Sequence, residues 1–292
     1  MRLFSLFLAA AVAGCSTPFE VELPAEDPRV VIESLFAADS LITLTLDRSE
    51  PLFRPDSGET DQIADATVRV YEDGVEVGRA VYVPNRSRYV SQVRARAGRT
   101  YRVRVEAPGL APAEAEDTVP LPRPFTVEVT RGPDPDRDRL DEVVVRFSDP
   151  AGPDFYALYG LAERRYVDPR FPPQVFPLTF RSTDPALADG SLEQLVTEVD
   201  DPFYLRAFFS DRPFDGTRVE IRLRVARLGD GSDQFEAFDR LRLAVPSPLY
   251  YRYQRALAQG NTPLDDVVRV PSNVEGGYGI FAAFAASERV LP

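Results

Sequence analysis

Hydrophobic and polar residues alternate along several short stretches of the first half of the chain, which predicts strands with one buried face. Residues 40–47 place Ile or Leu at every second position, and residues 101–106 alternate Tyr or Val with charged side chains. Glu72-Asp73-Gly74 supplies a hairpin turn between two such stretches. We expect strands at 30–36, 40–47, 67–71, 75–82, 89–93, 101–106 and 113–119. Their spacing predicts an immunoglobulin-like or transthyretin-like sandwich over residues 30–122.

The second half continues this pattern after a proline-rich junction. Pro120, Pro122 and Pro124 predict a stiff spacer, because proline has no N–H to donate to a central strand. Strands are expected at 143–147, 155–161, 175–181, 219–225 and 241–245, with a buried closing strand at 279–286. Residues 123–292 are therefore predicted to form a second β-rich domain. The fold class expected for the whole chain is mainly β and two-lobed.

One helix is expected towards the end of the chain, packed on the sheet of the second domain. Ser247 is a favourable N-cap, Pro248 occupies the tolerated first position, and Gly260 provides a C-terminal stop. The residues that would share the buried face of this helix are Leu249, Tyr253, Ala256 and Leu257.

The first fifteen residues have the pattern of a secretory signal. Arg2 precedes an apolar run at 3–12 that is too short to span a bilayer. The run ends in Val12-Ala13-Gly14-Cys15, which resembles the lipobox of bacterial lipoproteins, in which the Cys is diacylated and becomes the first residue. We predict a signal peptide over 1–14, lipid attachment at Cys15 and a flexible, Pro-rich and acidic stalk over 15–29. The alternatives are a plain signal peptide with an incidental Cys, or an uncleaved anchor.

Composition excludes several kinds of chemistry. The chain has no His and no Trp, and all 34 basic residues are Arg, so a His general base, a Lys Schiff base and a P-loop Lys are excluded. A single Cys rules out an internal disulfide and a Cys-based zinc site. A formal charge of -12 would repel a phosphate backbone, so nucleic acid is not an expected partner. We expect no cofactor.

Two segments resemble the domain of unknown function 4249 family of bacterial outer-membrane lipoproteins. Residues 19–36 read FEVELPAEDPRVVIESLF, and residues 271–281 read PSNVEGGYGIF. Weaker matches are Asp149-Pro150, Phe155-Tyr156 and the aromatic residues at 250–253. The family has no defined catalytic residues, so the resemblance implies architecture and location only. It also implies a partner, since such lipoproteins are typically encoded beside TonB-dependent receptors.

Two acidic segments were weighed as calcium sites. Asp134, Asp136 and Asp138, with Asp141 and Glu142, form a carboxylate-rich stretch. An EF-hand loop requires Gly at its sixth position and Glu at its twelfth, and the chain has Arg139 and Val145 there. Residues 229–233, Gly-Asp-Gly-Ser-Asp, have the composition of a turn. We interpret both segments as loops and predict no metal site, although a weak calcium site at either stays open.

The glycine motif at Asn273–Gly279 and a group of aromatic residues are the remaining candidates for recognition. Three Gly within four residues permit positive φ and close backbone approach, which suits either a binding loop or, preferably, a tight turn before the last strand. The aromatic residues flank the Pro-rich loops of the second half, where exposed rings could contact a protein or a glycan. They are Tyr156, Tyr159, Tyr166, Phe171 and Phe176.

The expected function is that of a non-catalytic binding or accessory protein, held at the outer membrane by lipid and associated with a TonB-dependent receptor in nutrient uptake. The first alternative is a surface adhesion or scaffold lipoprotein. The second is a glycan hydrolase that uses two carboxylates, whose spacing in three dimensions the sequence does not reveal. The ligand, the oligomeric state and the side of the membrane stay open.

Overall fold

The computed structural model describes residues 27–50, 61–132, 140–182, 184, 187, 207–226, 234–259 and 269–292. Its strands are β1 (Val30–Ala37), β2 (Leu41–Arg48), β3 (Thr67–Glu72), β4 (Val75–Val83), β5 (Arg88–Arg94), β6 (Thr100–Glu106), β7 (Ala113–Thr118), β8 (Phe125–Thr130), β9 (Leu140–Ser148), β10 (Phe155–Tyr166), β11 (Gln174–Arg181), β12 (Ala207–Ser210), β13 (Arg218–Ala226), β14 (Phe235–Pro246), β15 (Val274–Glu275) and β16 (Tyr278–Val290). A 3-10 turn, η1 (Pro84–Arg86), and one α-helix, α1 (Pro248–Gln259), complete the described elements. The mainly β class and the seven strands expected before residue 122 are confirmed.

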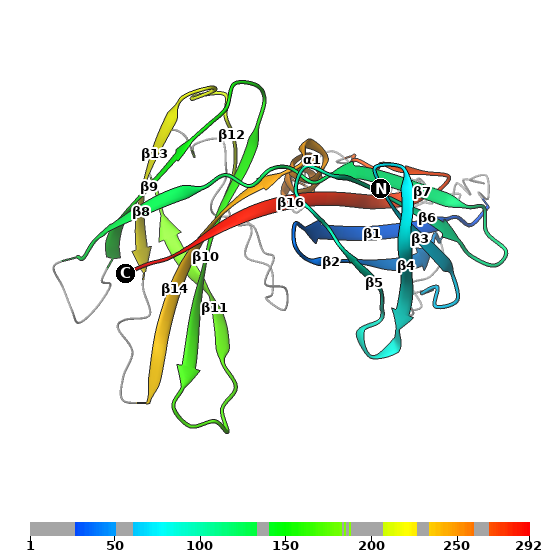
Figure 1. Cartoon of the computed structure of the whole chain (residues 1–292), viewed down its shortest axis with the longest axis horizontal. Helices are drawn as coiled ribbons and strands as arrows, with labels where there is room; N and C mark the ends of the chain where they lie inside the picture. Colours follow the sequence, from blue (N-terminus) through cyan, green and yellow to red (C-terminus); the bar gives the residue numbers. More distant parts are fainter. Residues whose placement is uncertain are drawn as a thin grey trace, which may run out of the picture.

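The described strands form one mixed sheet rather than two separate ones (Figure 1). Their order is β15-β7-β6-β3-β4-β5-β2-β1-β16-β14-β10-β11-β13-β9-β8, and β12 pairs with β10 beside this path. The predicted immunoglobulin-like or transthyretin-like sandwich is therefore not resolved as a unit of its own, because hydrogen bonds continue from its strands into the second half. The domain boundary predicted at residue 122 falls in the extended segment between β7 and β8 and stays a prediction.

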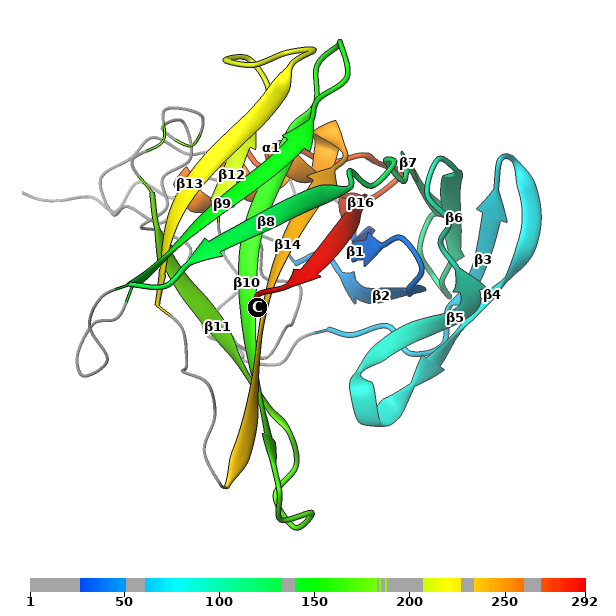
Figure 2. The ribbon, with the colours of Figure 1, turned by 60° about the vertical axis from the view of Figure 1, so that its left-hand side comes forward.

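The last strand, β16, joins the two halves of the sheet. Its first part pairs in parallel with β1, and its second part pairs antiparallel with β14; Phe284 takes part in both registers. Phe281, Ala283 and Ala285 point into a core made with β1 to β7, while β8 to β14 enclose a second core. Figure 2 shows the end of β16 beside β8, with which it is in contact. The predicted closing strand is confirmed, and it pairs with a strand of each half of the sheet.

Helix α1 covers the sheet where the halves meet. The Ser247 hydroxyl accepts the N–H of Tyr250 at 3.1 Å, so the predicted N-cap is confirmed. The buried face matches the prediction in part: Ala256 is buried and Leu249 and Tyr253 are partly buried, but Tyr250 and Tyr251 are buried as well and Leu257 is exposed. The tyrosine rings pack on Phe155, Phe208 and Phe284, which the sheet presents at this point. Within the described part of the chain, no helix has both the length and the apolar composition that a bilayer crossing requires.

The carboxylate of Asp117 connects β7 to the helix and to β16. It accepts the Ser247 hydroxyl at 2.6 Å and the backbone N–H of Ala283 at 2.8 Å. Burial raises the pKa of Asp117 above its ordinary value of 3.8, although these hydrogen bonds oppose the rise. The folded state therefore favours the protonated carboxyl.

This shift predicts a pH dependence of stability. Protonated Asp117 contributes stability that is fully present below pH 3.8 and is lost as the pH rises through its higher folded pKa. Asp117→Asn removes this titration. The unfolding free energy of the wild type, relative to the variant, should fall as the pH rises above 3.8 in urea titrations. Glu116→Gln, a neighbouring exposed carboxylate on β7, is the control and should leave the pH profile unchanged. If the difference in unfolding free energy between the wild type and Asp117→Asn does not change with pH, the raised pKa of Asp117 is contradicted.

Candidate functional site

The outer face of β8, β9 and β13 is a strongly charged surface built by neighbouring strands. The alternation predicted over 219–225 is confirmed, since its aliphatic residues are buried and its Glu and Arg residues are exposed. Register places side chains of the three strands in rows on this face: Thr126–Arg146–Glu220, Glu128–Val144–Arg222 and Thr130–Glu142–Arg224. Because side chains alternate between the two faces of each strand, the charged residues of the three strands form ordered rows on one face.

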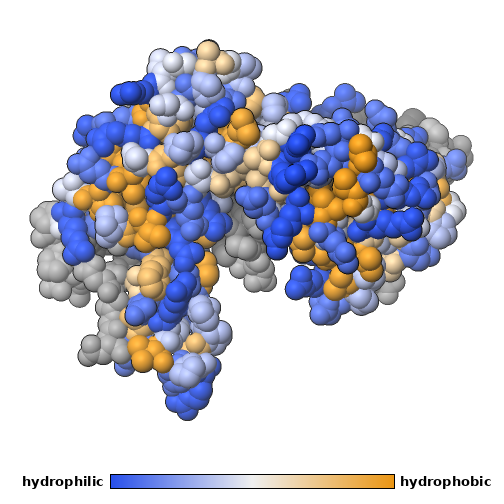
Figure 3. Space-filling model, in the orientation of Figure 1, coloured by the Kyte–Doolittle hydropathy of each residue, from blue (hydrophilic) through white to orange (hydrophobic). Residues whose placement is uncertain are grey.

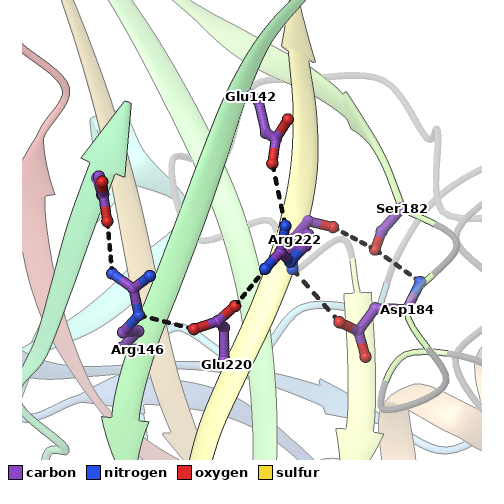
Figure 4. Close-up of polar contacts among 7 residues, drawn as sticks. Glu142, Arg146, Ser182, Asp184, Glu220 and Arg222 are labelled. Carbon is purple, nitrogen blue, oxygen red and sulfur yellow. Dashed lines mark hydrogen bonds and ion pairs between the residues drawn. The ribbon is translucent and has the colours of Figure 1, made fainter. Parts of the chain in front are cut away.

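Ion pairs connect these rows into a network (Figure 4). The Arg146 guanidinium contacts Glu128 at 2.7 Å and Glu220 at 2.8 Å. Arg222 contacts Glu220 at 2.9 Å and Glu142 at 3.5 Å. Exposed ion pairs of this kind contribute at most about 1 kcal/mol each, so the network orders the side chains more than it stabilises the fold.

The pKa values of the network shift as expected for opposite charges in contact. Hydrogen bonds to Glu128 and Glu220 raise the pKa of Arg146. Hydrogen bonds from Arg146 and Arg222 lower the pKa of Glu220. Arg146 and Glu220 therefore each favour the charged form, and they largely neutralise each other.

The segment after β11 adds polar contacts at the far side of β13 (Figure 4). The Ser182 hydroxyl donates to the carbonyl oxygen of Arg222 at 2.7 Å, and the Arg222 backbone N–H donates to Asp184 at 3.4 Å. The backbone N–H of Asp184 donates in turn to the Ser182 hydroxyl at 3.1 Å. These bonds attach Ser182 and Asp184 to β13 through its backbone.

An open groove of about 630 Å³ crosses the same face at its other end. It lies over the beginning of β8, the end of β9 and the beginning of β13, and the end of β16 borders it. Its lining also includes Pro124, Phe125, Phe147 and Val219, of which the last three are core residues with side chains only 2–5% exposed.

The charged groups in the groove are three guanidinium groups and one carboxylate: Arg146, Arg218, Arg289 and Glu220. Arg146 is already paired with acids, as described above. Arg218 and Arg289 have no carboxylate partner in the described part of the chain. Arg289 donates to the carbonyl oxygen of Glu288 at 2.8 Å and stacks over the Phe125 ring, with its guanidinium carbon 5.6 Å from the ring centre. The groove therefore carries excess positive charge in a chain whose formal charge is -12.

A comparison with known families matches residues 16–289 to a family described as Domain of unknown function (DUF4249). The chain belongs to this family. The match spans nearly the whole sheet, and it confirms the resemblance predicted from residues 19–36 and 271–281. A search of the curated proteins found no match to this DUF4249 chain.

The glycine motif of the DUF4249 chain is packed against the backbone of two other strands. Asn273 accepts the N–H of Phe281 at 3.0 Å, and its amide donates to the carbonyl oxygens of Phe281 and Glu116 at 2.9 and 2.8 Å. A side chain at Gly277 or Gly279 would collide with carbonyl oxygens of β1, and Gly279 has a φ of +105°. This geometry favours the interpretation as a structural turn, because the motif has no space for a ligand between its glycines and β1.

Three carboxylates that the sequence did not connect lie together in the loops beside the groove. The ligand atoms of Asp149, Asp211 and Asp215 are all within 4.8 Å of one another. Tyr156 and the backbone N–H of Gly216 donate to Asp149, and backbone N–H groups of the β9–β10 loop donate to the other two at 2.6 and 2.8 Å. Burial, followed by the charge of Asp149, raises the pKa of Asp211. These hydrogen bonds join the β9–β10 loop to the turn before β13. Holding these two loops together is a sufficient structural role for the three carboxylates.

The structure describes only some of the candidates chosen from the sequence. The predicted lipid-attachment residue Cys15, the carboxylates Asp134, Asp136 and Asp138, the segment 229–233 and the helix stop Gly260 lie outside the described residues. Asp141 is buried and accepts the N–H of Gly132 at 3.0 Å, whereas Glu142 is exposed and pairs with Arg222. Consecutive strand residues point to opposite faces, so Asp141 and Glu142 do not converge on one ion.

The aromatic residues proposed for recognition divide into two groups. Tyr156 and Tyr159 are 0% and 1% exposed, so the expectation that they form a recognition surface is wrong; they are core residues of β10. Tyr166 ends β10 and contacts Phe171 in the following loop, and Phe176 lies near the beginning of β11. The strand β10 is twelve residues long, and only its last part leaves the core.

The ends of β10, β11 and β14 form a projection, defined here as residues 163–177 and 235–238, that extends away from the rest of the molecule (Figure 1). Val167, Phe171 and Val175 are 69%, 55% and 51% exposed on it. Rings support this surface: Tyr166 packs on Phe171 and on Phe235, with ring centres 5.6 and 6.1 Å apart. Figure 3 shows apolar residues reaching the lower end of this half of the molecule.

Proposed function

We propose that this DUF4249 chain is a non-catalytic binding protein, anchored to the outer membrane by lipid on Cys15, that assists a TonB-dependent receptor in nutrient uptake. The anchor rests on the lipobox-like sequence at 12–15. The observation that carries the accessory role is the projection, whose exposed aliphatic and aromatic side chains suit contact with another macromolecule.

The shape of the projection favours a large partner. It is formed by strand ends that extend outward, so its apolar residues become buried only when another surface covers them. Arginine and aromatic side chains, which are enriched at protein interfaces, lie side by side here: Arg164 stacks on Phe176 and Phe235 at 5.3 and 5.0 Å. A packed ring and guanidinium pair loses little conformational freedom on binding.

Charge favours a protein over a lipid surface as this partner. Arg165 pairs with Glu163 at 2.5 Å and Arg170 pairs with Asp168 at 2.6 Å, so these arginines on the projection carry little free positive charge. The chain as a whole has a formal charge of -12, which opposes adsorption to anionic headgroups. The apolar tip between paired charges therefore fits a protein surface.

The proposal is tested by mutating the tip and purifying the protein in gentle detergent. We expect the wild-type chain to co-purify with a β-barrel receptor, and Phe171→Ser to reduce the recovered receptor roughly tenfold or more, because a central aromatic contact is lost. Mass spectrometry of the eluate identifies and quantifies the partner.

Val81→Ser is the matched control, since Val81 is a 64% exposed aliphatic residue on β4 in the other half of the sheet. It should leave the recovered receptor unchanged. If the wild-type chain brings down no β-barrel, the accessory role is wrong and the adhesion or scaffold alternative takes its place. If both variants lose the receptor equally, the projection is not the contact surface.

A further inference from the structure

We infer that the groove across β8, β9 and β13 binds an elongated ligand with two anionic groups, such as a dicarboxylate, one held by Arg218 and the other by Arg289. This inference uses neither the lipid anchor nor the receptor, so it stands apart from the proposed function. It rests on the place of these two arginines in the groove, on their lack of acidic partners in the described part of the chain and on the neutralised Arg146 between them.

The two arginines lie at opposite ends of the groove. Arg218 is on β13, and Arg289 stacks over Phe125 of β8. Strand β9 lies between β13 and β8, so the strand that carries Arg218 and the strand on which Arg289 stacks are two strand spacings, about 10 Å, apart. A ligand with a single anionic group, or with two adjacent ones, cannot reach both ends.

The middle of the groove suits an uncharged connecting segment. Arg146 lies there on β9, and its guanidinium is occupied by Glu128 and Glu220. Phe125, Phe147 and Val219 also belong to the lining, but their side chains lie in the core and are only 2–5% exposed. The pattern from one end to the other is thus a free cation, a neutralised ion pair and a second free cation.

The acidic net charge does not prevent such binding. Screening reduces interactions between exposed charges beyond about 10 Å at 0.1 M salt, so most acids of the chain act weakly on a ligand in the groove. The guanidinium groups, in contrast, can contact carboxylates directly and donate two parallel hydrogen bonds to each. Glu220 is the only acid that lines the described groove, and Arg146 and Arg222 pair with it.

Calorimetric titration of the full chain in detergent with three probes tests the inference. Suberate carries two carboxylates separated by a flexible apolar chain, malonate carries two adjacent ones, and octanoate carries one. We expect suberate to bind roughly tenfold more tightly than either of the others, because it alone engages both ends. Arg218→Gln and Arg289→Gln should each lower the affinity for suberate to that for octanoate.

Arg224→Gln is the matched control. Arg224 is an exposed arginine on the same strand, it has no acidic partner in the described part of the chain, and it lies outside the groove. It should bind suberate as the wild type does. The inference is overturned if suberate does not bind, if the three probes bind equally, or if Arg224→Gln weakens binding as much as the two groove variants. All substituted residues are exposed, and circular dichroism confirms that each variant is folded.

Discussion

Replacing Gly279 with alanine should destabilise the fold by about 4 kcal/mol or more, because two separate costs combine at this position. Its φ of +105° is rarely adopted by residues with a side chain, and a Cβ would overlap the carbonyl oxygen of Ile32. Gly279 pairs directly with Ile32 in the parallel register of β1 and β16. Relief of the overlap would separate these strands, which join the halves of the sheet. Urea unfolding followed by circular dichroism measures the loss.

Gly74→Ala separates the two costs. Gly74 has a φ of +83° in the β3–β4 turn, and a Cβ there would meet no atom within 4 Å. Backbone strain alone should cost about 1–2 kcal/mol. Were Gly279→Ala to cost no more than Gly74→Ala, the close approach to β1 would not be the reason that the motif requires glycine. The motif would then be free to serve as a binding loop.

The strands could be predicted from the sequence because burial of one face is a local property. Alternation over 101–106 and 219–225 follows directly from the pleat, and it is present in β6 and β13 as expected. The joining of the halves could not be predicted, since Phe284 pairs with Ala37 and with Pro246, and no local signal specifies such distant registers. The same limit affects α1, whose buried face is set by rings that other strands supply.

The candidate sites show this limit more strongly. The sequence places Arg218 at a polar strand position, but nothing near it indicates that Arg289 shares its groove. Asp149 and Asp211 are likewise brought together only by the pairing of β10 with β12 and by the turn before β13. A polar position that alternates with buried residues identifies an exposed side chain; the sheet order decides which exposed side chains become neighbours.

The largest expected effect on location comes from Cys15→Ser. Each buried CH₂ of an acyl chain contributes about 0.8 kcal/mol, and stable anchoring requires two chains or a second attachment signal. An acidic chain gains little from anionic headgroups, so lipid on Cys15 should supply nearly all of the membrane affinity. Its loss should therefore move nearly all of the protein out of the outer-membrane fraction.

Fractionation on a density gradient, combined with metabolic labelling by a palmitate analogue, measures both steps of this prediction. The wild-type chain should carry the label, and mass spectrometry should find a mature polypeptide that begins at an acylated Cys15. Cys15→Ser should lose the label together with the outer-membrane fraction, whereas the neighbouring control Thr17→Ser should keep both. An unacylated wild-type terminus, or an unlabelled Cys15→Ser protein that stays in the outer membrane, would show that something other than this cysteine holds the protein there.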